Sequence, residues 1–284
     1  MGKVLVVTSG KGGVGKTTST AALGAALAES GKSVAVVDFD VGLRNLDLVM
    51  GAERRVVYDF VDVITGRATL AQALIRDKRI GTLSLLAASL TLDKDALTDD
   101  GVANVVAELR RNFDWVICDS PAGIERGAML GMRHADAAVV VVNPEVSSVR
   151  DSDRIIRLLN TRTEKVEKGE ELPKHLLITR YDAARAGRGE MLSVADVQEI
   201  LSIPLVGIVP ECANVLRASN EGVPLVLSNP ASAAARAYRD AVRRLAGDHV
   251  PLTIPGESRR LFGRLFRRKP HEPVRSLCAV QQGA

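Results

Sequence analysis

The feature that most constrains this chain is a strand, a glycine-rich turn and a helix at its start. Residues 4–7 (VLVV) form a short apolar run typical of a buried strand, and the residues after Thr18 are rich in Ala and Leu, as in a helix. The turn between them, GKGGVGKT at 10–17, satisfies the phosphate-loop pattern GxxxxGK followed by Ser or Thr. Backbone N–H groups of such a loop and the positive end of the following helix bind phosphate oxygens. A glycine-rich turn without a ligand is the alternative.

The phosphate loop supplies most of the predicted nucleotide-binding residues. Its glycines carry no Cβ, so backbone N–H groups can converge on the phosphates. Lys16 is expected to contact the β- and γ-phosphates, and the Thr17 hydroxyl to bind Mg²⁺, so ATP and Mg²⁺ are the predicted cofactors. Two residues that follow later strands are expected to border the purine base. The predicted nucleotide-binding residues are Gly10, Lys11, Gly12, Gly13, Val14, Gly15, Lys16, Thr17 and Thr18 in the loop, and Arg180 and Pro210 beside the base.

Lys11 is a second lysine, at the first variable position of the loop. The spelling GKGGVGKT resembles the deviant Walker A family of ATPases. By that resemblance, Lys11 crosses to the nucleotide of a partner subunit when two monomers enclose two ATP molecules, as an arginine finger does in other NTPases. The alternative is a solvated lysine tolerated in a variable position.

Acidic residues follow two further apolar strands. One strand ends in Asp38, with Asp40 two residues later, and another ends in Asp119 in the Walker B pattern. In open parallel sheets, ligands bind at the carboxyl ends of the strands. We therefore expect Thr17, Asp38 and Asp119 to hold Mg²⁺, directly or through water, and Asp40 to orient the attacking water. With Lys11 and Lys16, Asp40 completes the predicted catalytic set. For Asp38 and Asp40, ordinary loop carboxylates that cap a helix are the alternative.

The chain as a whole has the pattern of an α/β fold. Its 284 residues are 46% hydrophobic with few aromatics, and Val-rich runs recur as they do in parallel strands covered on both faces. We expect a three-layer P-loop NTPase domain over residues 1–247, with a mostly parallel central sheet flanked by helices. The predicted strands are 4–7, 33–38, 82–87, 113–119, 137–142, 176–179 and 205–209, and the predicted helices include 56–78, 101–111 and 231–246.

Cysteine usage and hydropathy predict a cytoplasmic protein. The three cysteines, Cys118, Cys212 and Cys278, are scattered and form no CxxC pair, as is usual in a reducing compartment. No signal peptide precedes the first strand, and no apolar run is long enough to span a bilayer.

The end of the chain carries a second informative pattern. Residues 248–257 are predicted to be a linker, and residues 258–270 an amphipathic helix that lies in the plane of a membrane surface. Six basic residues surround its apolar stripe; they contribute +6 to a net charge of +4, which leaves −2 for the rest of the chain. Residues 271–284 are predicted to be disordered. The predicted membrane-binding stripe consists of Leu261, Phe262, Leu265 and Phe266.

Membrane binding by one such helix is marginal. Burying four apolar side chains and attracting six cations contributes ~14 kcal/mol, and ordering about eleven residues costs a similar amount. Two linked copies on a dimer bind ~10² to 10⁴ times more tightly. A dimer that forms with ATP would therefore be an ATP-dependent binder of anionic membranes. A basic nucleic-acid tail and a partner-docking helix are the alternatives.

Several longer runs carry a closer resemblance. TSGKGGVGKTT (8–18), DFDVGLRNLDLVMG (38–51), CDSPAGIE (118–125), NPEVSSVRDSDR (143–154) and VLRASNEG (215–222) are similar to motifs of the septum-site-determining branch of the MinD/ParA-type P-loop ATPases. This resemblance implies a homodimer with ATP, recruitment of the division inhibitor MinC, and release from the membrane by MinE-stimulated hydrolysis. It places a dimer and partner face at Arg44, Asn45, Gly123, Asp151 and Asp153. The chain departs from the family in having about fourteen residues after the amphipathic helix.

We therefore predict an ATP hydrolase on the cytoplasmic face of the inner membrane that regulates placement of the division septum. A partitioning ATPase that binds DNA nonspecifically is one rival, which the net charge of −2 outside the tail disfavours. A relative of iron–sulfur reductases is another, but the cysteine spacing offers no convincing bridging pair. A membrane scaffold that uses ATP only as a structural ligand is the non-enzymatic rival.

Overall fold

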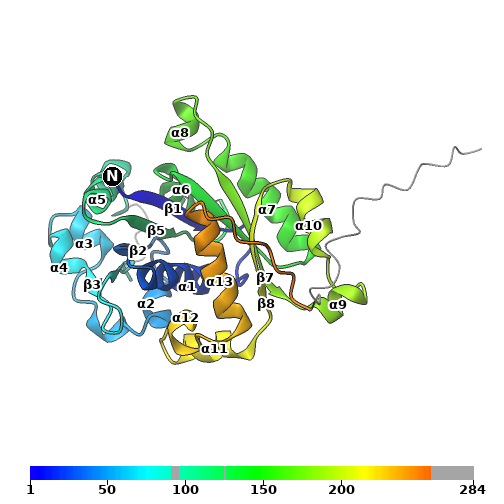
Figure 1. Ribbon diagram of the computed structural model, residues 1–284. Coiled ribbons are helices and arrows are strands. Elements are labelled where there is room, and N and C mark those ends of the chain that lie inside the picture. The colour runs from blue at the N-terminus through cyan, green and yellow to red at the C-terminus, as the bar shows by residue number, and fades with distance from the viewer. Residues whose placement is uncertain (91–95, 125, 257–284) are drawn as a thin grey trace, which may run out of the picture.

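The computed structural model describes residues 1–90, 96–124 and 126–256, and its centre is an eight-stranded sheet (Figure 1). The strands run parallel except β3, which pairs antiparallel with β4 at one edge. This arrangement confirms the predicted fold class. The strands are β1 (Lys3–Thr8), β2 (Val34–Asp38), β3 (Ile75–Arg76), β4 (Leu83–Leu86), β5 (Trp115–Asp119), β6 (Ala137–Val142), β7 (Lys174–Tyr181) and β8 (Leu205–Pro210), in the order β3-β4-β2-β5-β1-β6-β7-β8.

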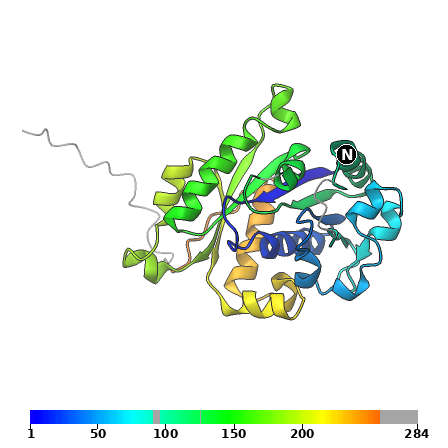
Figure 2. The same cartoon turned by 180° about the vertical axis from the view of Figure 1, so that it is seen from behind.

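Helices cover both faces of the sheet, as the two opposite views in Figures 1 and 2 show. Side chains alternate along β1, so Leu5 and Val7 pack in one apolar cluster and Val4 and Val6 in the other. The first cluster includes residues of α1 (Lys16–Glu29), α2 (Leu46–Val49), α11 (Ala213–Asn220), α12 (Leu225–Ser228) and α13 (Ala233–Leu245). The second includes residues of α3 (Phe60–Ile64), α4 (Leu70–Ala73), α5 (Asp99–Asn112), α6 (Arg126–Arg133), α7 (Val146–Leu159) and α10 (Val194–Leu201). Three further short helices are η1 (Glu53–Arg55), α8 (Glu164–Glu167) and α9 (Ala183–Gly187).

The helix predicted over 56–78 is wrong as a continuous element. Asp59 and Thr69 each begin a short helix, α3 and α4, through a capping box with the residue three positions later. Gly66, in the turn between them, has a φ of 75°, which a helix cannot contain. After α4, Ile75 and Arg76 pair with β4 instead of continuing a helix. Local caps and pairing with the next strand therefore divide this segment.

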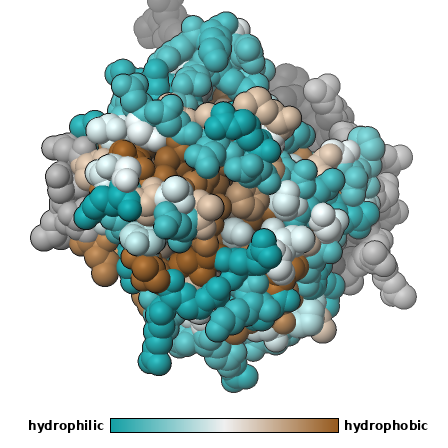
Figure 3. All heavy atoms as spheres, turned by 90° about the vertical axis from the view of Figure 1, so that its left-hand side faces the viewer, coloured by the Kyte–Doolittle hydropathy of each residue, from teal (hydrophilic) through white to brown (hydrophobic). Residues whose placement is uncertain are grey.

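The edge formed by α3, α4 and β3 leaves some apolar side chains partly open to solvent. Val63, Ile64 and Leu74 are only partly buried against the core. Figure 3 looks on to this side of the molecule and shows apolar surface in the middle of the face, surrounded by polar side chains.

The chain after α13 returns across the domain. The Arg244 guanidinium donates to the carbonyl oxygens of Val206 in β8 (2.8 Å) and of Val250 (2.8 Å) and Pro251 (2.5 Å). Ile254 packs against the core, and Gly256 lies against Ala183 of α9. Figures 1 and 2 show this coil running from the end of α13 to α9. We call residues 247–256 the strap.

The predicted amphipathic helix and the tail after it lie outside the described residues, as do Leu261, Phe262, Leu265 and Phe266. Among the residues that the structure describes, no helix has the length and apolar composition needed to cross a membrane.

Candidate nucleotide-binding site

The phosphate loop lies at the point where the order of the sheet reverses. β1 lies between β5 and β6, so the loop after β1 opens between the loops that follow these neighbouring strands. Gly13 and Gly15 have φ values of 75° and 95°, a backbone that favours glycine. Gly15 precedes α1 and offers no side-chain cap, and the first turn of α1 contains no acidic residue. The N–H groups of this turn therefore face the loop, as an anion requires.

Lys16 is buried beside the acidic residues of the site. Burial lowers the pKa of its amine, while the nearby Asp119 and Asp40 carboxylates oppose this shift. Lys16 thus places its amine at the base of the phosphate loop, with two carboxylates near it that favour its charged form.

Asp38 and Asp119 are adjacent residues on neighbouring strands, in register at the carboxyl ends of β2 and β5. Asp38 accepts hydrogen bonds from the backbone N–H groups of Asp40 (2.9 Å) and Leu46 (3.1 Å). Asp119 accepts from the Thr17 hydroxyl and from the Thr20 hydroxyl (2.9 Å). Two carboxylates so close together share a strongly negative environment at the end of the loop.

Both carboxyl groups have raised pKa values. Burial is the main cause at Asp38, with the Asp119 charge adding to it, so its pKa lies well above the ordinary value of 3.8. Burial also raises the pKa of Asp119 to about 6, against the hydrogen bonds from Thr17 and Thr20 and the charge of Lys16. A cation held here would be favoured because it would offset the buried negative charge.

The donor set fits Mg²⁺ bound together with a nucleotide. The Thr17 hydroxyl and the Asp119 carboxylate are hard oxygen donors in contact with each other. Within the described ranges, no cluster of three or more His, Cys, Asp or Glu side chains could hold a metal ion without help. Mg²⁺ takes few protein ligands and completes its shell with phosphates and water.

The catalytic side of the loop borders a cavity of about 420 Å³. Asp40 and Asn45 reach this cavity from the segment after β2, opposite the loop residues. The structure thus brings the predicted water-orienting acid and the predicted phosphate ligands to one space. The loop residues that line it are Gly12, Gly13, Lys16 and Thr17.

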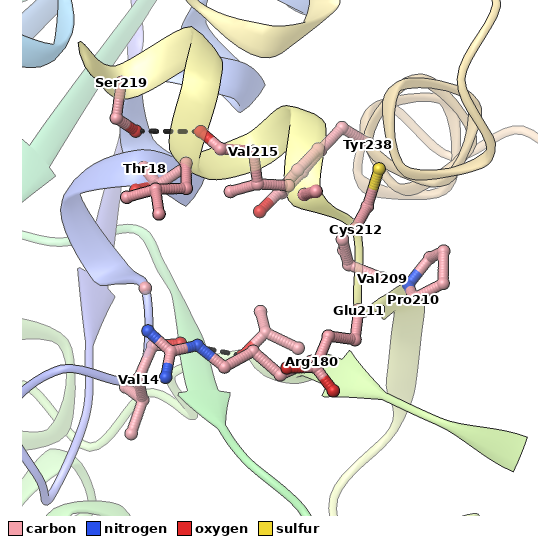
Figure 4. A pocket seen from close by; sticks show the side chains of 14 residues that line it. Val14, Thr18, Arg180, Val209, Pro210, Glu211, Cys212, Val215, Ser219 and Tyr238 are labelled. Atoms are coloured by element: carbon pink, nitrogen blue, oxygen red, sulfur yellow. Dashed lines mark hydrogen bonds between the residues drawn. The ribbon is translucent and has the colours of Figure 1, made fainter. Parts of the chain in front are cut away.

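A second cavity, of about 520 Å³, opens on the other side of the loop (Figure 4). We call it the base cavity. Arg180 and Pro210 line it from the ends of β7 and β8, together with Val14 and Thr18, so these predicted residues come together. The residue pattern did not assign the remaining wall, which α11 and α13 supply, to the base, although residues 215–222 carry one of the runs that resemble the family. Cys212, Val215, Leu216, Ser219 and Tyr238 form that wall.

Lys11 lies at the exposed mouth of the loop. Its Nζ contacts Glu145 Oε2 (3.1 Å) and Ser147 Oγ (2.9 Å), at the start of α7. The Lys11 and Glu145 side chains are 41% and 54% exposed, so this is a weak surface pair. Sequence reasoning did not identify these two partners, because they are more than 130 residues away.

The residues of the predicted partner face occupy the loops around the phosphate site. Gly123 N–H donates to Ser9 at the start of the loop (3.1 Å), and Asp151 packs its backbone against Gly10. Asn45 lines the catalytic cavity. Arg44 pairs with Asp47 in α2 (2.7 Å), and Asp153 pairs with Arg157 along α7 (2.6 Å).

Comparison with known proteins agrees with this geometry. Residues 5–225 match the CobQ/CobB/MinD/ParA nucleotide binding domain family. The septum site-determining protein MinD of Escherichia coli is 56% identical over 269 residues, which cover 94% of this chain and 99% of that protein.

Solved structures of similar fold come from two further organisms. The Aquifex aeolicus MinC:MinD cell division protein complex superposes with a TM-score of 0.79 and 42% identity, covering 89% of this chain and 99% of that one. The Pyrococcus horikoshii septum site-determining protein MinD, complexed with Mg-ADP, has a TM-score of 0.76 and 29% identity, covering 87% and 98%. The phosphate loop, its acidic partners and these relatives agree: the chain belongs to the MinD family of septum site-determining, ATP- and Mg²⁺-dependent P-loop ATPases.

Proposed function

We propose that ATP joins two copies of this chain face to face at the carboxyl edge of their sheets, and that the pair binds the membrane surface until hydrolysis separates it. In this arrangement the purine lies in the base cavity, and the phosphates lie on the loop from Gly10 to Thr18. Lys11 of each copy reaches the phosphates of the other.

The position of Lys11 is the observation that carries this proposal. It stands at the mouth of the loop, and its ammonium group contacts the exposed side chains of Glu145 and Ser147. Such a contact costs little to break. A lysine so placed can turn outward to a second molecule while Lys16 stays in its own site.

Exposed apolar side chains around the phosphate loop support a face that is buried when two copies associate. Leu43 follows β2, Ile124 follows β5 and Val146 begins α7, and they are 68%, 40% and 60% exposed. Leu43 lies beside Asp40, Ile124 follows the Gly123 that is bonded to the loop, and Val146 lies between the two partners of Lys11. Apolar groups that ring a charged site favour association with a matching surface.

Hydrolysis on this proposal depends on position and charge. Mg²⁺, when bound with ATP at Thr17 and Asp119, would neutralise part of the phosphate charge. Lys16 and the Lys11 of the second copy stabilise the negative charge that develops on the phosphoryl oxygens. Asp40 orients a water molecule in the catalytic cavity, and dimer closure excludes other water.

Membrane binding belongs to residues 258–270 in this proposal. One apolar stripe of Leu261, Phe262, Leu265 and Phe266 is marginal, so stable attachment requires two. The protein is then cytoplasmic and peripheral on the inner membrane, and it leaves the membrane when the ATP pair separates.

The partners follow from the family. The Aquifex relative forms a complex with MinC, and we propose that the dimer of this chain recruits MinC at the face that contains Arg44, Asn45, Gly123, Asp151 and Asp153. MinE would bind the same dimer, stimulate hydrolysis and release it, so that division is inhibited away from the division site.

Vesicle sedimentation with the full chain tests the proposal. Anionic vesicles should sediment the protein with Mg·ATP and not with Mg·ADP or without nucleotide, and single-turnover hydrolysis should be faster with these vesicles than with uncharged ones. Equal sedimentation in all three nucleotide states would contradict it. ATP-dependent retention on DNA that falls with salt would instead favour a partitioning ATPase.

A further inference from the structure

Arg79 follows β3 and joins three separate turns. Its guanidinium donates to the carbonyl oxygens of Gly222 (2.9 Å) and Met50 (2.7 Å). The same group makes two hydrogen bonds to the buried Asp77 carboxylate, at 2.6 and 3.1 Å. About a third of the side chain is exposed, so the head group is anchored while its stem borders solvent.

The turns that Arg79 joins are pressed together. Gly51 follows α2 and Gly222 follows α11, and a Cβ on Gly51 would stand 2.5 Å from the Gly222 carbonyl oxygen. Both glycines also have positive φ values, 62° and 63°. The ends of α2 and α11 therefore meet backbone to backbone, with the guanidinium across the junction.

The two helices lead to opposite sides of the nucleotide site. α11 supplies Val215, Leu216 and Ser219 to the base cavity. α2 begins at Leu46, whose N–H donates to Asp38 beside the predicted metal ligand Asp119. One guanidinium thus connects the wall of the base cavity with the segment that follows the metal side of the site.

We infer that Arg79 is a positioning residue for the nucleotide: by joining the ends of α2 and α11, it fixes the wall of the base cavity relative to the phosphate loop. Arg79 does not line either cavity. The inference rests on the proposed placement of the purine in the base cavity and of the triphosphate on the loop.

Removal of the guanidinium leaves the Met50 and Gly222 carbonyls and the Asp77 carboxylate without this donor. Because buried acceptors are costly to leave unpaired, the junction will relax and α11 will move. The phosphate loop belongs to α1 and β1 and keeps its own contacts. Affinity for the base should therefore fall while affinity for the triphosphate stays.

The test compares Mg·ATP with inorganic tripolyphosphate and Mg²⁺ by calorimetric titration. Arg79→Met should weaken ATP binding about 3- to 30-fold, the range found for residues that couple packed elements, and leave tripolyphosphate affinity unchanged. Arg79→Lys, which supplies a single ammonium in place of the planar fork, should lie between Arg79→Met and the parent. Arg55→Met is the matched control, because Arg55 also donates to a backbone carbonyl in this region, that of Arg76, without reaching α11.

Two results would overturn the inference: equal weakening of ATP and tripolyphosphate, or an unchanged ATP affinity in both Arg79 variants. Should Arg79→Met fail to fold, Arg79→Lys decides. Val215→Trp, which fills the base cavity, tests the placement of the purine separately. If this variant binds ATP as the parent does, the placement itself is wrong; if it weakens ATP binding while the Arg79 variants do not, only the role of Arg79 is wrong.

Discussion

Gly10 lies so close to Asp151 that a Cβ on residue 10 would stand 2.1 Å from the Asp151 carbonyl carbon. The first glycine of the phosphate loop therefore packs against the backbone of α7, with no space for a side chain. This backbone contact at Gly10, more than the exposed contacts of Lys11, holds the loop against α7. A change in one must displace the other.

Gly10→Ala should destabilise the nucleotide-free protein, because its methyl group forces α7 away from the loop. Overpacking of this kind costs about 1 to 3 kcal/mol. Gly12→Ala is the matched control, because a Cβ on residue 12 would meet no atom within 4 Å and the φ of Gly12 is not positive. Thermal unfolding without nucleotide should show a lower midpoint for Gly10→Ala only. Equal unfolding midpoints for the two variants would mean that α7 moves away from residue 10 without loss of stability.

Lys11→Ala should leave the fold intact and abolish ATP-dependent dimerisation, membrane recruitment and hydrolysis. The contact with Glu145 is an exposed pair worth about 0 to 1 kcal/mol, so the free energy of unfolding should hardly change. Light scattering and vesicle sedimentation with ATP measure the loss. Lys168→Ala, at an exposed position just after α8, is the control for removal of a lysine. Unchanged sedimentation of Lys11→Ala would remove the argument for the dimer.

The parts of the fold that follow from local pattern could be predicted from the sequence. Each buried strand is a short apolar run, and parallel strands bring their carboxyl ends to one edge, so Lys16, Asp38 and Asp119 meet there as expected. The interruption of 56–78 depends on local capping boxes that the helical pattern hides and on the pairing of residues 75–76 with β4.

The wall of the base cavity is the second feature that local pattern does not predict. Arg180 and Pro210 could be chosen because they end strands, but Val215 and Tyr238 are ordinary helical residues whose place depends on how α11 and α13 pack. Tyr238 meets Ser19 of α1 across 219 residues of sequence (3.0 Å). Contacts of this kind depend on the whole fold, and the spacing of residues along the sequence does not predict them.

Removal of Mg²⁺ should matter more at neutral than at acidic pH. Burial raises the pKa of Asp119 from its ordinary value of 3.8 to about 6, so the folded protein binds a proton here more readily than the unfolded chain. Stability from this group is therefore highest below about pH 4 and falls as pH rises to about 6, by about 3 kcal/mol in all. Asp38, also raised, acts in the same direction.

Above pH 6 the buried Asp119 carboxylate is charged, and its charge lowers the stability of the fold. Bound Mg²⁺ can offset this loss. The increase in unfolding midpoint that Mg²⁺ adds to ADP, relative to ADP with a chelator, should be larger at pH 7.5 than at pH 5.5. Asp119→Asn should remove most of this difference, because the amide carries no charge to offset. An equal effect of Mg²⁺ at the two pH values would argue against Asp119 as its ligand.

Arg244→Met should release the strap. The guanidinium holds the carbonyl groups of Val206, Val250 and Pro251 together, so its loss should cost about 1 to 3 kcal/mol and expose residues 247–256 to protease. Arg243→Met is the matched control, because the neighbouring Arg243 reaches the strap through an exposed ion pair with Asp248, which contributes little to stability. Limited proteolysis and thermal unfolding should separate the two variants.

A released strap also lengthens the tether before residue 257, and the advantage of two linked tails falls as a tether grows. Vesicle binding with ATP should then weaken in Arg244→Met while hydrolysis without vesicles stays at the parental rate; loss of both together would mean that Arg244 supports the nucleotide site itself.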